Sequence, residues 1–166
     1  ICQVVRVFAD DDVVHVDGKI SPTGDIETIN TELILADLQT LEKAVPRLEK
    51  EARIVKEKRA AYENAVAAQR CLEAGETLYA AHTAYGVDLA EARGLQLLTT
   101  KPFIYVFNLD EDQLTDEALH STLKAAVAPA DCVFLNAKLE ADLADLDAEE
   151  ARELLESVGV SEPGLD

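Results

Sequence analysis

The sequence of residues 103–111 is Phe103-Ile104-Tyr105-Val106-Phe107-Asn108-Leu109-Asp110-Glu111. An apolar run follows Lys101-Pro102 and ends abruptly in an amide and two acids. Such a run is typical of a buried parallel strand with polar groups at its carboxyl end. Ligands bind at that end in open α/β sheets, and an amide near a carboxylate has the donors and acceptors to contact a nucleotide base.

A second apolar run, Cys132–Leu135, ends in Asn136-Ala137-Lys138. If both runs are neighbouring strands, this second loop would close over the same base. The alternative is two core strands with ordinary polar loops, and the spacing alone leaves both interpretations open.

The composition indicates a folded protein with an uneven charge. The 166 residues, 48% of them hydrophobic, suffice for one domain or for a domain with an extended insertion. A net charge of −18 argues against a nucleic-acid surface over the whole molecule. Between Lys43 and Arg70, however, eight Lys or Arg and four Glu give a window of +4, and the remainder carries −22. This basic segment could contact an anionic partner of its own.

Other features favour a cytoplasmic protein without metal or membrane contacts. The cysteines, Cys2, Cys71 and Cys132, are too far apart for a metal pair. Two of them lie inside apolar runs and are interpreted as buried thiols, and a reducing compartment is expected. The acidic run 10–12 is interpreted as a solvated loop rather than a metal site, and His15 as a packed side chain. The sequence predicts neither a signal peptide nor a membrane span. Because residue 1 is not Met, we expect the gene to start elsewhere.

Residues 25–55 have the spacing of an amphipathic helix. Asp25 is predicted to be its N-cap, and Pro46 is expected to bend it. Apolar residues recur at alternating intervals of four and three, which predicts a heptad seam. The seam residues are Ile34, Leu38, Leu41, Val45, Leu48, Ala52 and Val55.

A second seam precedes Gly75, and it consists of Ala61, Ala65, Ala68 and Leu72. Two successive seams predict an antiparallel helical hairpin with its turn near 54–59. No Gly or Pro marks that turn, so one long bent helix is the alternative. The basic residues Lys56, Lys58 and Arg59 gather at the expected tip, which is either a partner-binding surface or a solvated one.

The rest of the chain has an α/β pattern. Residues 1–8 are predicted to form a strand, residues 87–98, 115–126 and 139–146 helices, and residues 147–159 a final helix. A strand, a long helical excursion, then strand, helix, strand and helix predict three parallel strands joined by right-handed crossovers.

Several motifs occur together along the chain. They are Asp10-Asp11-Asp12 with Val14-His15-Val16, Gly18-Lys19, Asp25-Ile26-Glu27, Ile29–Leu33, Leu35–Leu38, Leu98–Pro102, Asn108-Leu109-Asp110-Glu111 and Glu162-Pro163-Gly164-Leu165. With these motifs the chain resembles the YchF family, the Obg-like ATPases among the translation-factor-related P-loop GTPases. The resemblance covers nearly the whole chain. In that family Asn-x-x-Glu stands where most GTPases have Asn-Lys-x-Asp.

The resemblance implies a fold and a site. The fold is an α/β partial P-loop G domain of about three parallel strands with flanking helices, formed by residues 1–24 and 87–166. An antiparallel α-helical coiled-coil hairpin, residues 25–86, interrupts it. Asn108 and Glu111 would read the base, Leu109 would lie against it, and Ala137 and Lys138 would close the loop over it. The implied cofactor is ATP or GTP with Mg²⁺, and the Glu of the motif is associated with tolerance for adenine.

The chain also departs from the family pattern. It has no Gly-x-x-x-x-Gly-Lys-[Ser/Thr] motif, and the switch regions and the TGS domain of the family are missing. Asn136 stands where related GTPases usually have Ser, and the hairpin turn lacks a Gly that relatives often carry. We therefore expect a central fragment that binds no nucleotide tightly and is inactive alone. Its first strand would lose a neighbour, and the exposed edge would favour self-association.

Two functions of different classes follow. The first is the base-recognition part of an enzyme that hydrolyses ATP, either in preference to GTP or beside it, in association with ribosomes or nucleic acid. The second is a non-catalytic coiled-coil module that docks on the ribosome or RNA through Lys56, Lys58 and Arg59.

Overall fold

The computed structural model describes residues 1–8 and 21–164. The expectations for residues 10–12, His15, Gly18-Lys19 and Leu165 lie outside this part. The chain forms two compact units, residues 1–26 with 103–166, and residues 27–102. The domain limits expected from the resemblance stay a prediction.

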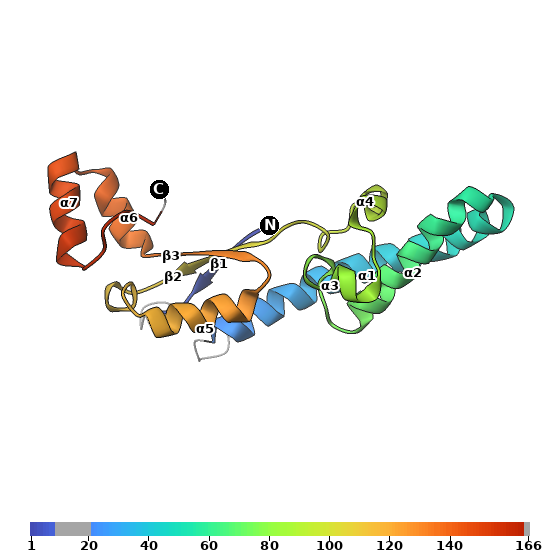
Figure 1. Ribbon diagram of the computed structural model, residues 1–166, viewed down its shortest axis with the longest axis horizontal. Helices are drawn as coiled ribbons and strands as arrows, with labels where there is room; N and C mark the ends of the chain where they lie inside the picture. Colours follow the sequence, from blue (N-terminus) through green and yellow to red (C-terminus); the bar gives the residue numbers. More distant parts are fainter. Residues whose placement is uncertain (9–20, 165–166) are drawn as a thin grey trace. The chain divides into compact units, whose positions relative to one another are not determined.

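The strands and helices (Figure 1) are β1 (Cys2–Arg6), α1 (Pro22–Ile54), η1 (Lys56–Lys58), α2 (Arg59–Glu73), α3 (Leu78–Tyr85), α4 (Leu89–Ala92), η2 (Arg93–Leu95), β2 (Ile104–Asn108), η3 (Glu111–Gln113), α5 (Glu117–Val127), β3 (Asp131–Leu135), α6 (Ala137–Ala144) and α7 (Ala148–Ser157).

The first unit is built on a parallel sheet in the order β1-β2-β3. Its strands end at the paired residues Arg6, Asn108 and Leu135, so these residues share the carboxyl edge of the sheet. The three predicted parallel strands are therefore confirmed. Within the described residues β1 pairs on one side only, and self-association through its other edge stays a prediction.

One face of the sheet holds the core of this unit. Val5, Phe107 and Phe134 lie on the same face, and Phe107 has no exposed surface. The Phe134 ring lies 5.4 Å from that of Phe107, and it stacks on His120 of α5 at a centroid distance of 4.1 Å. Helix α5 thus covers this face. On the opposite face Val4 is 68% exposed.

The second unit contains most of α1 together with α2 to η2. Helix α1 ends at Ile54 and α2 begins at Arg59, so the chain is not one long helix. The break falls inside the predicted turn. Val55 has extended backbone angles (φ −121°, ψ 110°) and is 42% exposed. Its predicted place in the heptad seam is wrong, because the helix ends one residue earlier.

The core of the second unit is shared among several elements, because α3 and the segments on either side of α4 and η2 contribute to it as well as α1 and α2. The buried cluster is Ile34, Leu41, Ala44, Leu48, Ala65, Ala68, Cys71, Leu72, Leu78, Val87 and Leu97. A two-helix coiled coil therefore stays a prediction.

A buried carboxylate ties α1 to the segment before β2. Asp37 is 2% exposed, and its Oδ1 accepts a hydrogen bond of 2.7 Å from the Leu98 backbone N–H. Its Oδ2 accepts two more, each of 2.7 Å, from the N–H and the hydroxyl of Thr99. Thr99 has no exposed surface. The three bonds replace water around the carboxylate and fix the end of the second unit against its long helix.

Two local predictions are wrong. Asp25 does not cap α1, because the helix begins at Pro22 and the Ser21 Oγ accepts a hydrogen bond from the Gly24 N–H at 3.2 Å. Ser at N-cap followed by Pro at the first helical position is a favoured start. The helix predicted over 87–98 is limited to α4 and η2. η2 ends at Leu95, and Gln96 follows it with a left-handed φ of 54°. No helix in the described part of the chain is long and apolar enough to cross a membrane.

Candidate functional site

The carboxyl ends of β2 and β3 bring together the predicted base-reading motif and the predicted base-closing loop. Asn108 is the last residue of β2, and Leu135, the last residue of β3, pairs with it. Ala137 begins α6 two residues further on. Two segments separated by 29 residues in sequence therefore meet at one edge of the sheet.

The Asn108 side chain is held in one orientation. Its Oδ1 accepts a hydrogen bond of 2.9 Å from the Ala137 backbone N–H. The backbone carbonyl of Asn108 accepts one of 3.0 Å from the Val7 N–H. The Nδ2 group makes no hydrogen bond to any of the described residues. Asn108 is half-buried, so this amide nitrogen can donate to an acceptor on a planar ligand.

Leu109 and Asn136 lock the two loops to each other. The Leu109 N–H donates to the Leu135 carbonyl, and its own carbonyl accepts from the Asn136 Nδ2, each at 2.8 Å. The Asn136 Oδ1 accepts from the Leu139 N–H at 2.8 Å, so the same side chain caps α6. Leu109 is fully buried in the core, and its predicted contact with a base stays a prediction.

Sequence reasoning missed the role of Asn136. Its side chain is 8% exposed and uses its oxygen and its amide nitrogen within the protein. The available signal was its position, because an Asn between a strand and an amphipathic helix is a strong N-cap candidate. A serine there could cap the helix but would not also reach the Leu109 carbonyl with a second polar atom.

Glu111 begins a turn, η3, that is closed by hydrogen bonds. Asp110 and Gln113 form a capping box around η3, with the Gln113 Oε1 accepting from the Asp110 N–H at 2.9 Å. His120 Nε2 lies 3.0 Å from the Gln113 carbonyl, while its ring stacks on Phe134. Glu111 is exposed and has no ion pair among the described residues. Its carboxylate is therefore free to accept hydrogen bonds from a ligand.

Lys138 and the tip residues lie at the surface. Lys138 is exposed in the first turn of α6, within the predicted base-closing loop. At the tip, Lys58 lies 3.8 Å from Glu51, and Arg59 lies 2.8 Å from Glu63. The hydrogen bond to Glu63 raises the pKa of Arg59. Lys56 has no ion pair among the residues that the structure describes.

Gly164 packs against the end of β3. The Gly164 N–H donates to the Glu140 Oε1 at 2.6 Å. A Cβ added at Gly164 would lie 2.8 Å from the Leu135 Cβ and 2.9 Å from the Phe134 carbonyl oxygen. Only glycine fits this approach without displacement, so Gly164 supports the strand end at which the site lies.

Burial acts on two of the three cysteines, Cys71 and Cys132, while Cys2 is exposed. Burial raises the pKa of Cys71 to about 11, so its thiol is neutral at physiological pH. Burial also raises the pKa of Cys132. In residues 1–8 and 21–164 no group of three or more His, Cys, Asp or Glu side chains could hold a metal ion.

Comparisons with known proteins identify relatives along the whole chain. It is 39% identical over 171 residues to the ribosome-binding ATPase YchF of Bacillus subtilis, covering 100% of this chain and 47% of the relative. It is also 39% identical over 164 residues to the ribosome-binding ATPase YchF of Escherichia coli O157:H7, covering 98% of this chain and 45% of the relative. The chain thus spans about half the length of the relatives that it matches. No model of a known protein family matches it.

A solved structure has the same fold. It is the YchF GTPase of Schizosaccharomyces pombe, which superposes with a TM-score of 0.75 at 22% identity. The match covers 96% of this chain and 46% of that one. The resemblance inferred from the motifs is therefore confirmed along the whole chain, and the sheet with its flanking helices matches a region of a YchF structure.

Proposed function

We propose that this chain, homologous to YchF proteins along its whole length, carries the base-recognition site and helical segment of a cytoplasmic, ribosome-associated nucleotide hydrolase. The observation that supports this proposal most strongly is the hydrogen bond between the Ala137 N–H and the Asn108 Oδ1. It fixes the amide of the predicted base-reading residue and leaves its Nδ2 group available. The relatives named as ATPases and as a GTPase support a nucleotide as the ligand.

The chemistry of the site fits a nucleotide base, and the names of the relatives favour ATP or GTP, whose bases are purines. The Asn108 Nδ2 group donates to an acceptor such as a ring nitrogen, and Glu111 accepts from an exocyclic amine or a ring N–H. An adenine offers an amine, whereas a guanine offers both an amine and a ring N–H. Magnesium would be held with the phosphates, and none of the residues assigned here to the site would coordinate it.

We expect the 166-residue chain alone to hydrolyse no ATP and to bind it more weakly than micromolar. Phosphate contacts supply most of the binding and the positioning in P-loop enzymes, and this sequence contains no Walker motif. Phosphate release and calorimetry with Mg-ATP test this, with the Bacillus subtilis relative as the active control. A micromolar dissociation constant, or phosphate release above blank, contradicts the expectation.

A second candidate function is docking of the α1–α2 tip on the ribosome or RNA. Three exposed cations favour the tip as a docking surface, and one of them, Lys56, has no ion pair among the described residues. The partner ions of Lys58 and Arg59 are exposed as well, and exposed pairs exchange readily for phosphate contacts.

Replacement of Lys56, Lys58 and Arg59 by Glu reverses the charge of the tip and should weaken ribosome co-sedimentation about threefold or more at low salt. The effect should fade as salt is raised, because the contact is electrostatic. Arg70→Glu, on the exposed surface of α2 but remote in sequence from the tip, is the control. Unchanged binding of the triple variant would show that the tip does not dock on the ribosome.

A further inference from the structure

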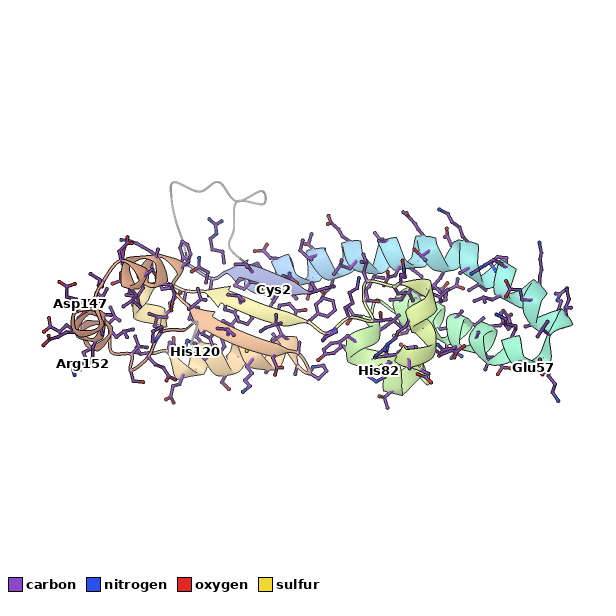
Figure 2. The ribbon with its side chains drawn as sticks, turned by 90° about the horizontal axis from the view of Figure 1, so that it is seen from above. Cys2, Glu57, His82, His120, Asp147 and Arg152 are labelled. Atoms are coloured by element: carbon purple, nitrogen blue, oxygen red, sulfur yellow. The ribbon has the colours of Figure 1, made fainter. Side chains whose placement is uncertain are left out.

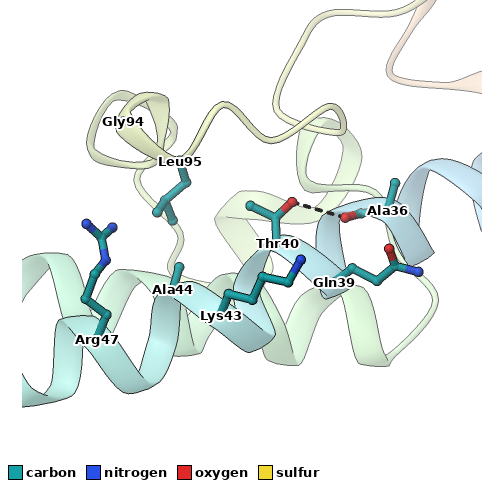
Figure 3. Close-up of a pocket in the computed structure, with 8 residues that line it drawn as sticks. All are labelled: Ala36, Gln39, Thr40, Lys43, Ala44, Arg47, Gly94 and Leu95. Carbon is teal, nitrogen blue, oxygen red and sulfur yellow. Dashed lines mark hydrogen bonds between the residues drawn. The ribbon is translucent and has the colours of Figure 1, made fainter.

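A groove in the second unit lies between α1 and the η2 turn (Figure 3). Its volume is about 510 Å³. One wall is formed by α1, and the other by Gly94 and Leu95. The residues that line it are Ala36, Gln39, Thr40, Lys43, Ala44, Arg47, Gly94 and Leu95.

The groove is basic. Lys43 and Arg47 lie one helical turn apart on α1, and none of the lining residues is acidic. Neither cation has an ion pair among the described residues, in contrast to Arg53, Lys58 and Arg59 near the tip. Like charges at positions i and i+4 destabilise a helix by about 0.2–0.5 kcal/mol. This arrangement has no compensating carboxylate within the groove, and an anionic ligand would supply the missing countercharge.

The other lining residues, apart from Lys43 and Arg47, suit an extended ligand rather than a single ion. Ala36, Ala44 and Gly94 are small and keep the groove open, while the Gln39 amide can donate or accept. A Cβ added at Gly94 would have no atom within 4 Å, so the space in front of this backbone is empty of protein. The hydroxyl of Thr40 is already used, since it donates to the Ala36 carbonyl at 3.2 Å.

The backbone beside the groove has an uncommon conformation. Gln96 follows η2 with a φ of 54°, which is rare for a residue other than Gly, Asn or Asp. This turn holds Gly94 and Leu95 opposite α1. Such backbone is often retained at binding sites, where the surrounding structure maintains it.

We infer that the groove between α1 and η2 binds the phosphodiester backbone of a single RNA strand through Lys43 and Arg47. The side chains of two residues one helical turn apart start about 5–6 Å from each other, which allows them to contact successive phosphates. An open groove without buried donors does not enclose a free phosphate ion. The inference rests on the proposed association with ribosome or RNA, and it adds a contact that is separate in sequence from the tip.

The test is fluorescence anisotropy of a labelled single-stranded 12-nucleotide RNA with the whole chain, over a range of salt concentrations. Lys43→Glu with Arg47→Glu should weaken binding about tenfold or more. The slope of log K against log salt should become less steep by about 1.4, since two phosphate contacts are lost from a single strand. Arg70→Glu with Lys124→Glu makes the same change in net charge at exposed sites outside the groove and should change binding less than twofold.

The other outcomes are distinct. If the groove variant and its control bind RNA equally well, the groove is not the site, while RNA association itself stands. If the unmodified chain binds no RNA, the groove and the proposed RNA association both fail. If 10 mM inorganic phosphate displaces the RNA at constant ionic strength, the groove is a free-phosphate site and the RNA assignment is overturned. The Lys43→Gln, Arg47→Gln variant, with far-UV circular dichroism, separates loss of charge from misfolding.

Discussion

Replacement of Asp37 by Ala is expected to lower the free energy of unfolding of the second unit by about 3–5 kcal/mol. The buried carboxylate accepts three hydrogen bonds of 2.7 Å from Leu98 and Thr99. Its removal leaves two backbone N–H groups unsatisfied in a region where Thr99 has no exposed surface. Each buried unsatisfied donor costs about 1–3 kcal/mol, and bonds to a charged group are the stronger ones.

A graded series makes this prediction specific. Asp37→Asn retains the shape but points an amide N–H at a backbone donor, so it should cost less than Asp37→Ala and more than Thr99→Val. Thr99→Val removes one hydroxyl bond and should cost about 1 kcal/mol. Urea unfolding followed by circular dichroism measures the series, and amide exchange at Leu98 and Thr99 localises it. A loss below 1 kcal/mol for Asp37→Ala contradicts the proposed importance of the carboxylate.

Replacement of Asn136 by Ala is expected to destabilise the first unit by about 2–3 kcal/mol and to disorder the loop that presents Glu111. The loss combines an N-cap, worth about 1 kcal/mol, with a Leu109 carbonyl left without its partner. Asn136→Ser should retain the cap on α6 and lose only the bond to Leu109, so its cost should be about half as large.

Nuclear magnetic resonance provides the measurement for this pair of variants. In Asn136→Ala the amide signals of Leu109 and Glu111 should shift or broaden, and exchange of the Leu109 N–H should accelerate. In Asn136→Ser these changes should be smaller. Equal stability of the three proteins would show that the two loops hold together without Asn136, and that other contacts carry the link.

Periodicity and strand chemistry predict much of this fold. Buried apolar runs ending in polar residues correctly indicate strands β2 and β3, and the parallel order follows from the long crossovers. The break between α1 and α2 also falls within the expected turn. Two errors fall at element ends, where Ser21-Pro22 caps the helix in place of Asp25 and where Val55 leaves the helix, because one local hydrogen bond or one turn decides them. A larger error is the helix predicted over 87–98, where only the short elements α4 and η2 are helical.

Less of the candidate site than of the fold could be predicted from the sequence. The motif identified Asn108 and Ala137, but only the structure shows that one holds the other. The function of Asp37 depends on partners 61 and 62 residues away, and no local pattern reveals such a pair. The stacking of His120 on Phe134 likewise depends on tertiary packing, and Figure 2 shows His120 beside the sheet.

The most direct test of the central proposal is a titration of ¹⁵N-labelled chain with ATP and GTP, and with UTP as the pyrimidine control. The proposal predicts millimolar binding of both purine nucleotides, with shift changes concentrated at Asn108–Glu111 and Asn136–Lys138. Asn108→Ala should abolish these changes, and Glu111→Asp should move the preference toward GTP. Shift changes that are absent, that occur elsewhere, or that are the same for UTP would contradict base recognition at this edge of the sheet.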